Sequence, residues 1–177
     1  RRCHYGYVVL GLIVLVVFSA LGLARFGYTS LMPAMQHALH LTNTQTGILQ
    51  SWNLVGYLVT VGFAGVLAAR FGPRAVIGCG LLIVALGMAV TGLIPTFGAA
   101  VLGRFLAGVG GAGSNVPAMA LVSPWFGARR RGLAAGVGVA GSSVGLMVTG
   151  PLIPALLHHC GDHGWRVCWY VLAGLTL

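Results

Sequence analysis

The chain has 177 residues, of which 58% are apolar and only 6% are charged. Because a soluble domain carries about a quarter charged residues, this composition excludes a globule with a polar, water-facing surface and indicates a protein surrounded by lipid. The formal net charge of +9 comes from ten arginines and a single acid, Asp162. The arginines are scattered between apolar runs, so they indicate membrane edges and not a nucleic-acid-binding face.

Apolar runs long enough to cross a bilayer, about 20 residues at 1.5 Å each, predict six transmembrane helices. Polar or Gly-Pro breaks separate them. The predicted fold class is therefore an all-α membrane protein, with residues 1–177 forming one six-helix bundle. The last run covers about 20 Å, less than the ~30 Å hydrocarbon core, so we expect the polypeptide to continue. The predicted spans are about 5–35, 46–69, 75–95, 97–123, 132–157 and 165–177.

The basic residues also predict an orientation. If the spans alternate, only Arg166 lies in a loop on one side, and the other loop and terminal arginines lie on the opposite side. By the positive-inside rule, the N-terminus is cytoplasmic and the loop with His159 is external, in a multi-pass protein of the cell (inner) membrane. A cleaved secretory signal in the first run is the alternative, but apolar character resumes after Arg25. The arginines on the cytoplasmic side are Arg1, Arg2, Arg70, Arg74, Arg129, Arg130 and Arg131.

The first and fourth spans each contain a buried arginine, Arg25 and Arg104. A guanidinium in a membrane span costs about 2.5–3.5 kcal/mol and is normally paired, yet no carboxylate lies in any of the six spans. The counter-charge must therefore come from the missing half of the polypeptide, from backbone carbonyls and water, or from an anionic substrate. Both arginines fall in the outer half, so if they face one cavity they form a bidentate site for the carboxylate of such a substrate. The alternative is that Arg25 snorkels to the headgroups and Arg104 caps a helix contact. Asn115 is a further candidate for substrate binding.

The second span carries a polar stripe on one helical face, with spacings of four, three, four and three residues. We interpret it as the lining of a water-filled cavity, with Trp52 and Leu54 packing against helices or lipid. The alternative is hydrogen bonding between helices. The stripe consists of Thr46, Gln50, Asn53, Tyr57 and Thr60.

The fifth span is lined with small residues at four-residue spacing, a pattern typical of close helix packing. Proline then interrupts it, which predicts a bend and either a moving hinge or static packing. The small residues are Gly132, Gly136 and Ala140 on one line and Gly141 and Gly145 on another, followed by Gly150, Pro151 and Pro154.

We predict no metal site and no cofactor. The loop with His158, His159 and Cys160 has several possible ligands but no second cluster to complete a site. The four cysteines form no C-x-x-C pair and indicate neither a disulfide framework nor a zinc site.

Two motifs resemble those of the major facilitator superfamily. Gly65-Val-Leu-Ala-Ala-Arg-Phe-Gly-Pro-Arg74 is similar to its signature between the second and third helices, and Arg70, Gly72 and Arg74 match. Ala69 stands where the family usually has an aspartate, so any gating contact of that carboxylate does not carry over. Arg104-Phe-Leu-Ala-Gly108-Val-Gly110 resembles the second motif, which the family associates with substrate or proton handling.

The resemblance implies helices one to six of a twelve-helix secondary transporter, built as two three-helix repeats around a cavity lined by helices one, two, four and five. Its implied partners are the lipid bilayer, a small solute and a C-terminal six-helix half, with no nucleic acid. The segments at residues 24–28, 33–35 and 53–58 resemble the YbfB/YjiJ group. Residues 125–141 instead resemble the monocarboxylate and oxalate:formate exchangers, and only this likeness implies an organic-anion substrate.

Two other functions remain as alternatives. An intramembrane serine protease of rhomboid type would use Gly113-Ser114 in the fourth helix, but it needs a histidine base in the sixth, and no histidine occurs at 165–177. A non-transporting membrane scaffold or receptor would be favoured if the polar stripe faced lipid.

Overall fold

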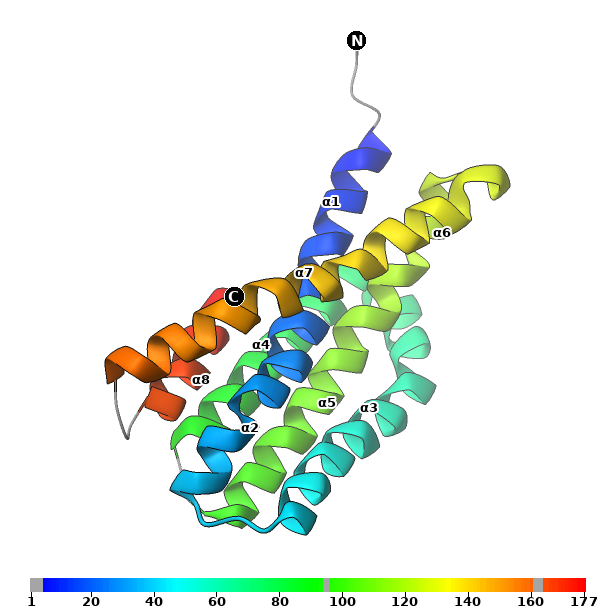
Figure 1. Ribbon diagram of the computed structural model, residues 1–177. Helices are drawn as coiled ribbons and strands as arrows, with labels where there is room; N and C mark the ends of the chain where they lie inside the picture. Colours follow the sequence, from blue (N-terminus) through cyan, green and yellow to red (C-terminus); the bar gives the residue numbers. More distant parts are fainter. Residues whose placement is uncertain (1–4, 94–95, 161–163) are drawn as a thin grey trace.

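The computed structural model describes residues 5–93, 96–160 and 164–177, and every regular element in them is helical. This confirms the predicted all-α class. Figure 1 shows the helices packed lengthwise against one another. They are α1 (Tyr5–Val17), η1 (Phe18–Phe26), α2 (Gly27–Ala38), α3 (Asn43–Phe71), α4 (Pro73–Leu93), α5 (Phe97–Ala120), α6 (Val122–Trp125), α7 (Ala128–Cys160) and α8 (Gly164–Thr176).

Within the described residues, five helical segments are long and apolar enough to cross a membrane. The α8 helix has 13 residues and follows them. The α3 helix begins before the apolar run that predicts it, because Thr42 caps it. The Thr42 hydroxyl accepts a hydrogen bond from the Gln45 backbone N–H (3.3 Å), and the Gln45 side chain accepts one from the Thr42 N–H (2.9 Å). The five segments are Tyr5–Ala38, Asn43–Phe71, Pro73–Leu93, Phe97–Trp125 and Ala128–Cys160.

The first segment is one continuous helix with an unusual middle. Between α1 and α2 the chain forms nine residues of π-helix, η1, which contains Arg25. Wider π-helical turns are rare and often occur at functional sites. The segment then continues through Pro33 without a break. The π-helix therefore sets the direction in which Arg25 leaves the backbone.

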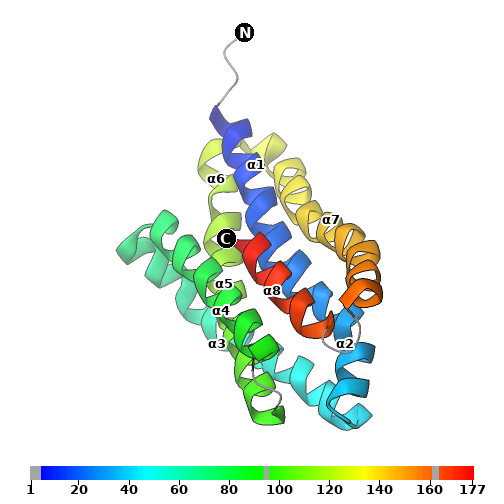
Figure 2. The same cartoon turned by 90° about the vertical axis from the view of Figure 1, so that its left-hand side faces the viewer.

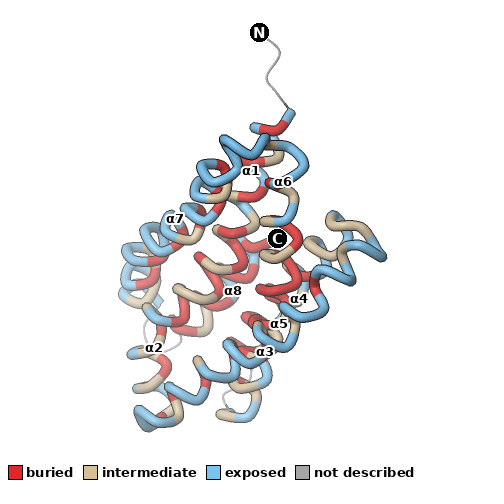
Figure 3. Tube along the Cα trace, turned by 90° about the vertical axis from the view of Figure 1, so that its right-hand side faces the viewer, coloured by how far each residue is buried: buried red, intermediate tan, exposed pale blue. Residues whose placement is uncertain are grey.

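Glycines bring α5 into backbone contact with both α3 and α4. A Cβ on Gly108 of α5 would overlap the backbone carbonyl of Asn53 on α3, and one on Gly87 of α4 would lie 2.6 Å from the Ala107 N of α5. Only glycine permits such an approach. Figure 3 shows the result, with buried residues on the inner faces of α4, α5 and α8 and exposed residues on the outer side of α7. The α5 helix thus forms the centre against which the polar side chains of α3 are held.

Only one of the two predicted lines of small residues on α7 packs against other helices. Gly141 and Gly145 lie against α1 and η1, and a Cβ on Gly145 would overlap the backbone of Gly22. Gly136 and Gly150, in contrast, are exposed with no atom near their Cβ positions, so they make no packing contact within the described chain. The line through Gly132, Gly136 and Ala140 is rotated away because Ala134 and Gly138 occupy the buried face.

The prolines of α7 do not interrupt the helix, contrary to the prediction. The α7 helix runs from Ala128 to Cys160 through Pro151 and Pro154 as one α-helix, as its ribbon in Figure 1 shows. Membrane helices tolerate proline when neighbouring groups satisfy the freed carbonyls. Pro151 therefore marks no helix break here.

One end of the bundle brings together three parts of the chain that are distant in sequence. The rings of Tyr5 and Trp125 lie 5.1 Å apart, and both line a cavity of about 350 Å³ together with Arg74. Figure 2 shows the start of α1 beside α6 at this end. The α3–α4 turn and the start of α7 therefore lie on the same side of the protein, as the alternation of spans requires.

Candidate functional site

Arg104 is fully buried at the centre of the bundle (0% exposed), although it is the most polar side chain of α5. Its Nη1 donates a hydrogen bond to the backbone carbonyl of Ala24 in η1 (3.0 Å), and its Nη2 donates one to Gln50 Oε1 in α3 (3.4 Å). Its Nε has no acceptor within the described residues. The guanidinium is thus held by neutral acceptors only, with donor capacity to spare.

Two aromatic rings complete the surroundings of this guanidinium. The Cζ atom lies 4.5 Å from the ring centroid of Tyr28 in α2 and 5.7 Å from that of Trp169 in α8. Aromatic faces attract a cation by roughly 2 kcal/mol when water is excluded. They do not neutralise it, since a ring carries no net charge. Among the residues that the structure describes, the positive charge therefore remains uncompensated.

Arg25 lies beside this site in η1 and is half-buried. It directly follows Ala24, whose carbonyl binds Arg104. Its charge acts on Arg104 by coulombic repulsion. The structure thus brings the two predicted arginines into one neighbourhood, where they reinforce a positive potential that an anion would relieve.

A polar pocket of about 370 Å³ lies between α2 and α3, next to the buried arginine. Tyr28 and Gln50 belong both to its wall and to the contacts of Arg104. The Tyr28 hydroxyl donates to the backbone carbonyl of Thr46 (2.9 Å), which ties the two helices together at the wall of the pocket. The remaining polar groups are side chains able to bind hydroxyls or oxyanions, namely Thr29, Gln36, Asn43 and Thr46.

The polar stripe of α3 divides between this pocket and the helix interface. Asn53 is buried and its Nδ2 donates to the backbone carbonyl of Arg104 (3.0 Å), while Tyr57 OH accepts from Asn115 Nδ2 (2.9 Å). Both therefore make the interhelical hydrogen bonds that were the alternative interpretation of the stripe. Thr60 bonds only to its own helix, at the Gly56 carbonyl. Gln50 and Thr46 line the pocket.

This geometry predicts a stability role for Asn53. Replacing Asn53 by alanine removes a hydrogen bond between α3 and α5, and we expect a loss of about 0.6–1.7 kcal/mol of unfolding free energy. Thermal unfolding of the purified full-length protein measures it. Ser51→Ala is the matched control, because the Ser51 hydroxyl bonds only to Gly47 of its own helix. Equal Tm values for the two variants would contradict the assignment.

The α3–α4 loop motif lies away from this site. Gly72 has a positive φ of 85° and its N–H binds the Ala68 carbonyl, so it ends α3 in a conformation that favours glycine. Arg70 is exposed and lies over the ring of Phe71, 5.5 Å from its centroid. Gly65 faces open space. Arg70 and Arg74 thus lie at the edge of the bundle.

Sequence reasoning missed two members of the site, Tyr28 and Trp169. Neither belongs to a polar stripe, and their role depends on α2 and α8 approaching α5. Ser114, the nucleophile that a protease would need, instead donates to the carbonyls of Gly110 and Gly111 in its own helix (2.9 and 3.2 Å).

Comparison with known proteins gives a match over nearly the whole chain. A model of the Major Facilitator Superfamily matches residues 14–177. The chain is 30% identical over 138 residues to a probable L-galactonate transporter of Escherichia coli (strain K12), covering 78% of this chain and 30% of that protein. It is 26% identical over 177 residues to a probable sulfoacetate transporter of Cupriavidus necator, covering 100% and 40%. A phosphoglycerate transporter protein of Salmonella typhimurium is 26% identical over 162 residues, covering 90% and 34%. The chain thus spans well under half the length of these relatives.

Proposed function

The chain belongs to the Major Facilitator Superfamily, and from this premise we propose that it forms the N-terminal six-helix half of a secondary transporter for a small organic anion. The solute moves by alternating access, with the six helices rocking against a second half around a central site. This superfamily is one of transporters and not of enzymes, so the protease alternative no longer stands.

The observation that carries the anion proposal is the uncompensated charge of Arg104. A buried cation is stable when a counter-charge pairs with it. Asp162, the only acid of the chain, belongs to no predicted span and lies outside the described residues. We therefore assign the missing charge to the solute, whose oxyanion group binds Arg104 and Arg25 in bidentate geometry.

The polar pocket supports a solute that also carries neutral polar groups. Gln50 and Tyr28 connect the pocket to Arg104, so one molecule can place its anionic end at the arginine and its remaining part between α2 and α3. Asn53, Tyr57 and Asn115 then serve as supports that hold α3 on α5. The loop from Gly65 to Arg74 acts in gating through its arginines, without the carboxylate usual at position 69.

The relatives support the same solute class. L-galactonate, sulfoacetate and phosphoglycerate, which name three of them, are all organic anions. As subfamily we propose the monocarboxylate and oxalate:formate exchangers ahead of the YbfB/YjiJ group, because the arginine pair favours an organic-anion substrate.

The test is equilibrium binding to the purified full-length protein. The three named anions are compared with neutral and cationic analogues of similar size. We expect binding of at least one anion and no competition by the cationic analogues. Preference for a cationic analogue would contradict the anion proposal and leave the transporter assignment intact.

We also propose that the end carrying Arg74 and Trp125 is cytoplasmic, because the arginine-rich loops lie there. The test uses proteins that each keep a single cysteine. Ala69→Cys and Ala128→Cys should resist an impermeant thiol reagent added outside intact cells. The protein whose single cysteine is the native Cys160, exposed at the far end of α7, should react. The probe is placed at Ala69 and not at Gly72, because a cysteine at φ 85° would be strained. Labelling at 69 and 128 but not at 160 would reverse the orientation.

A further inference from the structure

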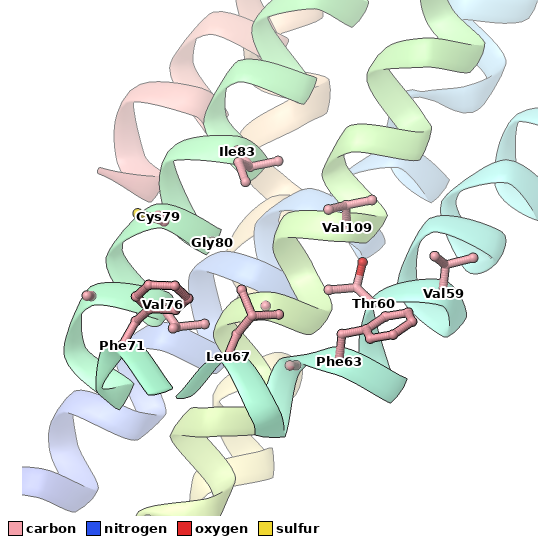
Figure 4. A pocket seen from close by; sticks show the side chains of 13 residues that line it. Val59, Thr60, Phe63, Leu67, Phe71, Val76, Cys79, Gly80, Ile83 and Val109 are labelled. Carbon is pink, nitrogen blue, oxygen red and sulfur yellow. The ribbon is translucent and has the colours of Figure 1, made fainter. Parts of the chain in front are cut away.

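The α3 and α4 helices meet at the turn around Gly72 and diverge away from it, and they leave an apolar groove of about 580 Å³ between them. Figure 4 shows the lining side chains converging from both helices, with Val109 of α5 at the base. Thr60 is the polar exception, and its hydroxyl is already bonded to the Gly56 carbonyl. The groove therefore offers only dispersion and hydrophobic contacts to an occupant. Its main side chains are Val59, Phe63, Leu67, Phe71, Val76 and Ile83.

The length of the groove matches one leaflet of a membrane. On α3 the lining runs from Val59 to Phe71, which at 1.5 Å per residue is about 18 Å. Half of the ~30 Å hydrocarbon core is about 15 Å. A chain lying in the groove would thus extend from the membrane midplane to its edge.

The edge end of the groove carries a positive charge. Arg70 is exposed and lies over the ring of Phe71, a lining residue, at 5.5 Å. Position 69 is an alanine, and the only acid of the chain is Asp162, so no neighbouring carboxylate in the loop neutralises Arg70. A guanidinium at the end of an apolar groove is complementary to a phosphate joined to an acyl chain.

We propose that this groove binds one anionic phospholipid, with an acyl chain between α3 and α4 and the phosphate on Arg70. The site is separate from the proposed solute site, which lies between α2, α3 and α5.

Native mass spectrometry of the full-length protein tests the proposal, with phosphatidylglycerol and phosphatidylcholine as the added lipids. We expect one tightly bound phosphatidylglycerol and at least roughly tenfold weaker binding of phosphatidylcholine. Arg70→Gln should weaken phosphatidylglycerol binding by roughly tenfold. Ala75→Phe, which fills the groove, should weaken both lipids. Arg129→Gln, which removes an exposed arginine at the start of α7, is the matched control and should change neither.

A second readout locates the lipid. Cys79 is exposed and lines the groove. In a variant that retains only this cysteine, phosphatidylglycerol should slow alkylation by N-ethylmaleimide, and Arg70→Gln should remove the protection. Equal binding of the two lipids, or binding without protection of Cys79, would overturn the proposal. So would a Cys79 that is unreactive in lipid-free protein, because another part of the polypeptide would then fill the groove.

Discussion

Replacing Arg104 by glutamine will weaken binding of the transported anion by one to two orders of magnitude. The reason is that a hydrogen bond between charged groups contributes about 1.5–3 kcal/mol. Within the described chain the hydrogen-bond acceptors of Arg104 are neutral, so the charged hydrogen bond that the substitution removes is the one to the solute. Lysine should restore binding in part, since an ammonium keeps the charge but lacks the planar fork. Equilibrium binding of L-galactonate, sulfoacetate and phosphoglycerate to the full-length protein gives the affinities.

The control for this prediction is Arg129→Gln, which removes an exposed arginine at the start of α7 and should bind normally. Thermal unfolding identifies a variant that binds poorly because it is misfolded. Arg25→Gln distinguishes a second ligand of the anion from an arginine that reaches the headgroups, because only the former loses affinity. Unchanged binding by both Arg104→Gln and Arg25→Gln would remove the anion proposal.

Leucine at Gly108 will prevent α3 and α5 from packing and will destabilise the protein by about 3 kcal/mol or more. A Cβ there overlaps the Asn53 carbonyl, and the obstacle is backbone, which cannot rotate away. The two helices must separate, which also breaks the hydrogen bond from Asn53 to the Arg104 carbonyl. Folded yield and Tm of the full-length protein measure the effect.

Gly98→Leu in the same helix is the matched control, because its Cβ position meets nothing within 4 Å. It should leave the free energy of unfolding within about 0.5 kcal/mol of that of the parent protein, as surface substitutions usually do. If both glycines tolerate leucine equally, the close contact between α3 and α5 is not a feature of the folded protein.

The all-helical class followed from the sequence, because unbroken apolar runs of about 20 residues satisfy their backbone groups in lipid as helices, whereas membrane strands are shorter and alternate apolar with polar residues. The π-helix did not follow. No periodicity in residues 18–26 indicates it, and the close approach of η1 to Gly145 of α7 is visible only in the folded chain. The continuity of α7 through Pro151 could not be predicted from the sequence either, because a proline in a helical run predicts a break unless its surroundings are known.

The site shows the same division. Arg25 and Arg104 were predictable because a charge in a membrane span is rare. The partners of Asn53 and Tyr57 were not, because a polar stripe looks identical whether it meets water or a neighbouring helix. Glycines had the same ambiguity, as Gly136 and Gly145 show. Each belongs to a line of small residues at four-residue spacing, and only the rotation of α7 decides which line packs against another helix.

The place of Trp169 against Arg104 gives the protein an intrinsic optical probe. Indole fluorescence shifts in wavelength when a nearby charge is compensated, and the Trp169 ring is fully buried, 5.7 Å from the guanidinium. Of the four tryptophans, Trp52 and Trp125 are exposed, and Trp165 lies under Arg166 instead. A protein that keeps only Trp169, with phenylalanine at the other three positions, would therefore register occupation of the arginine site as an emission change, without any label attached.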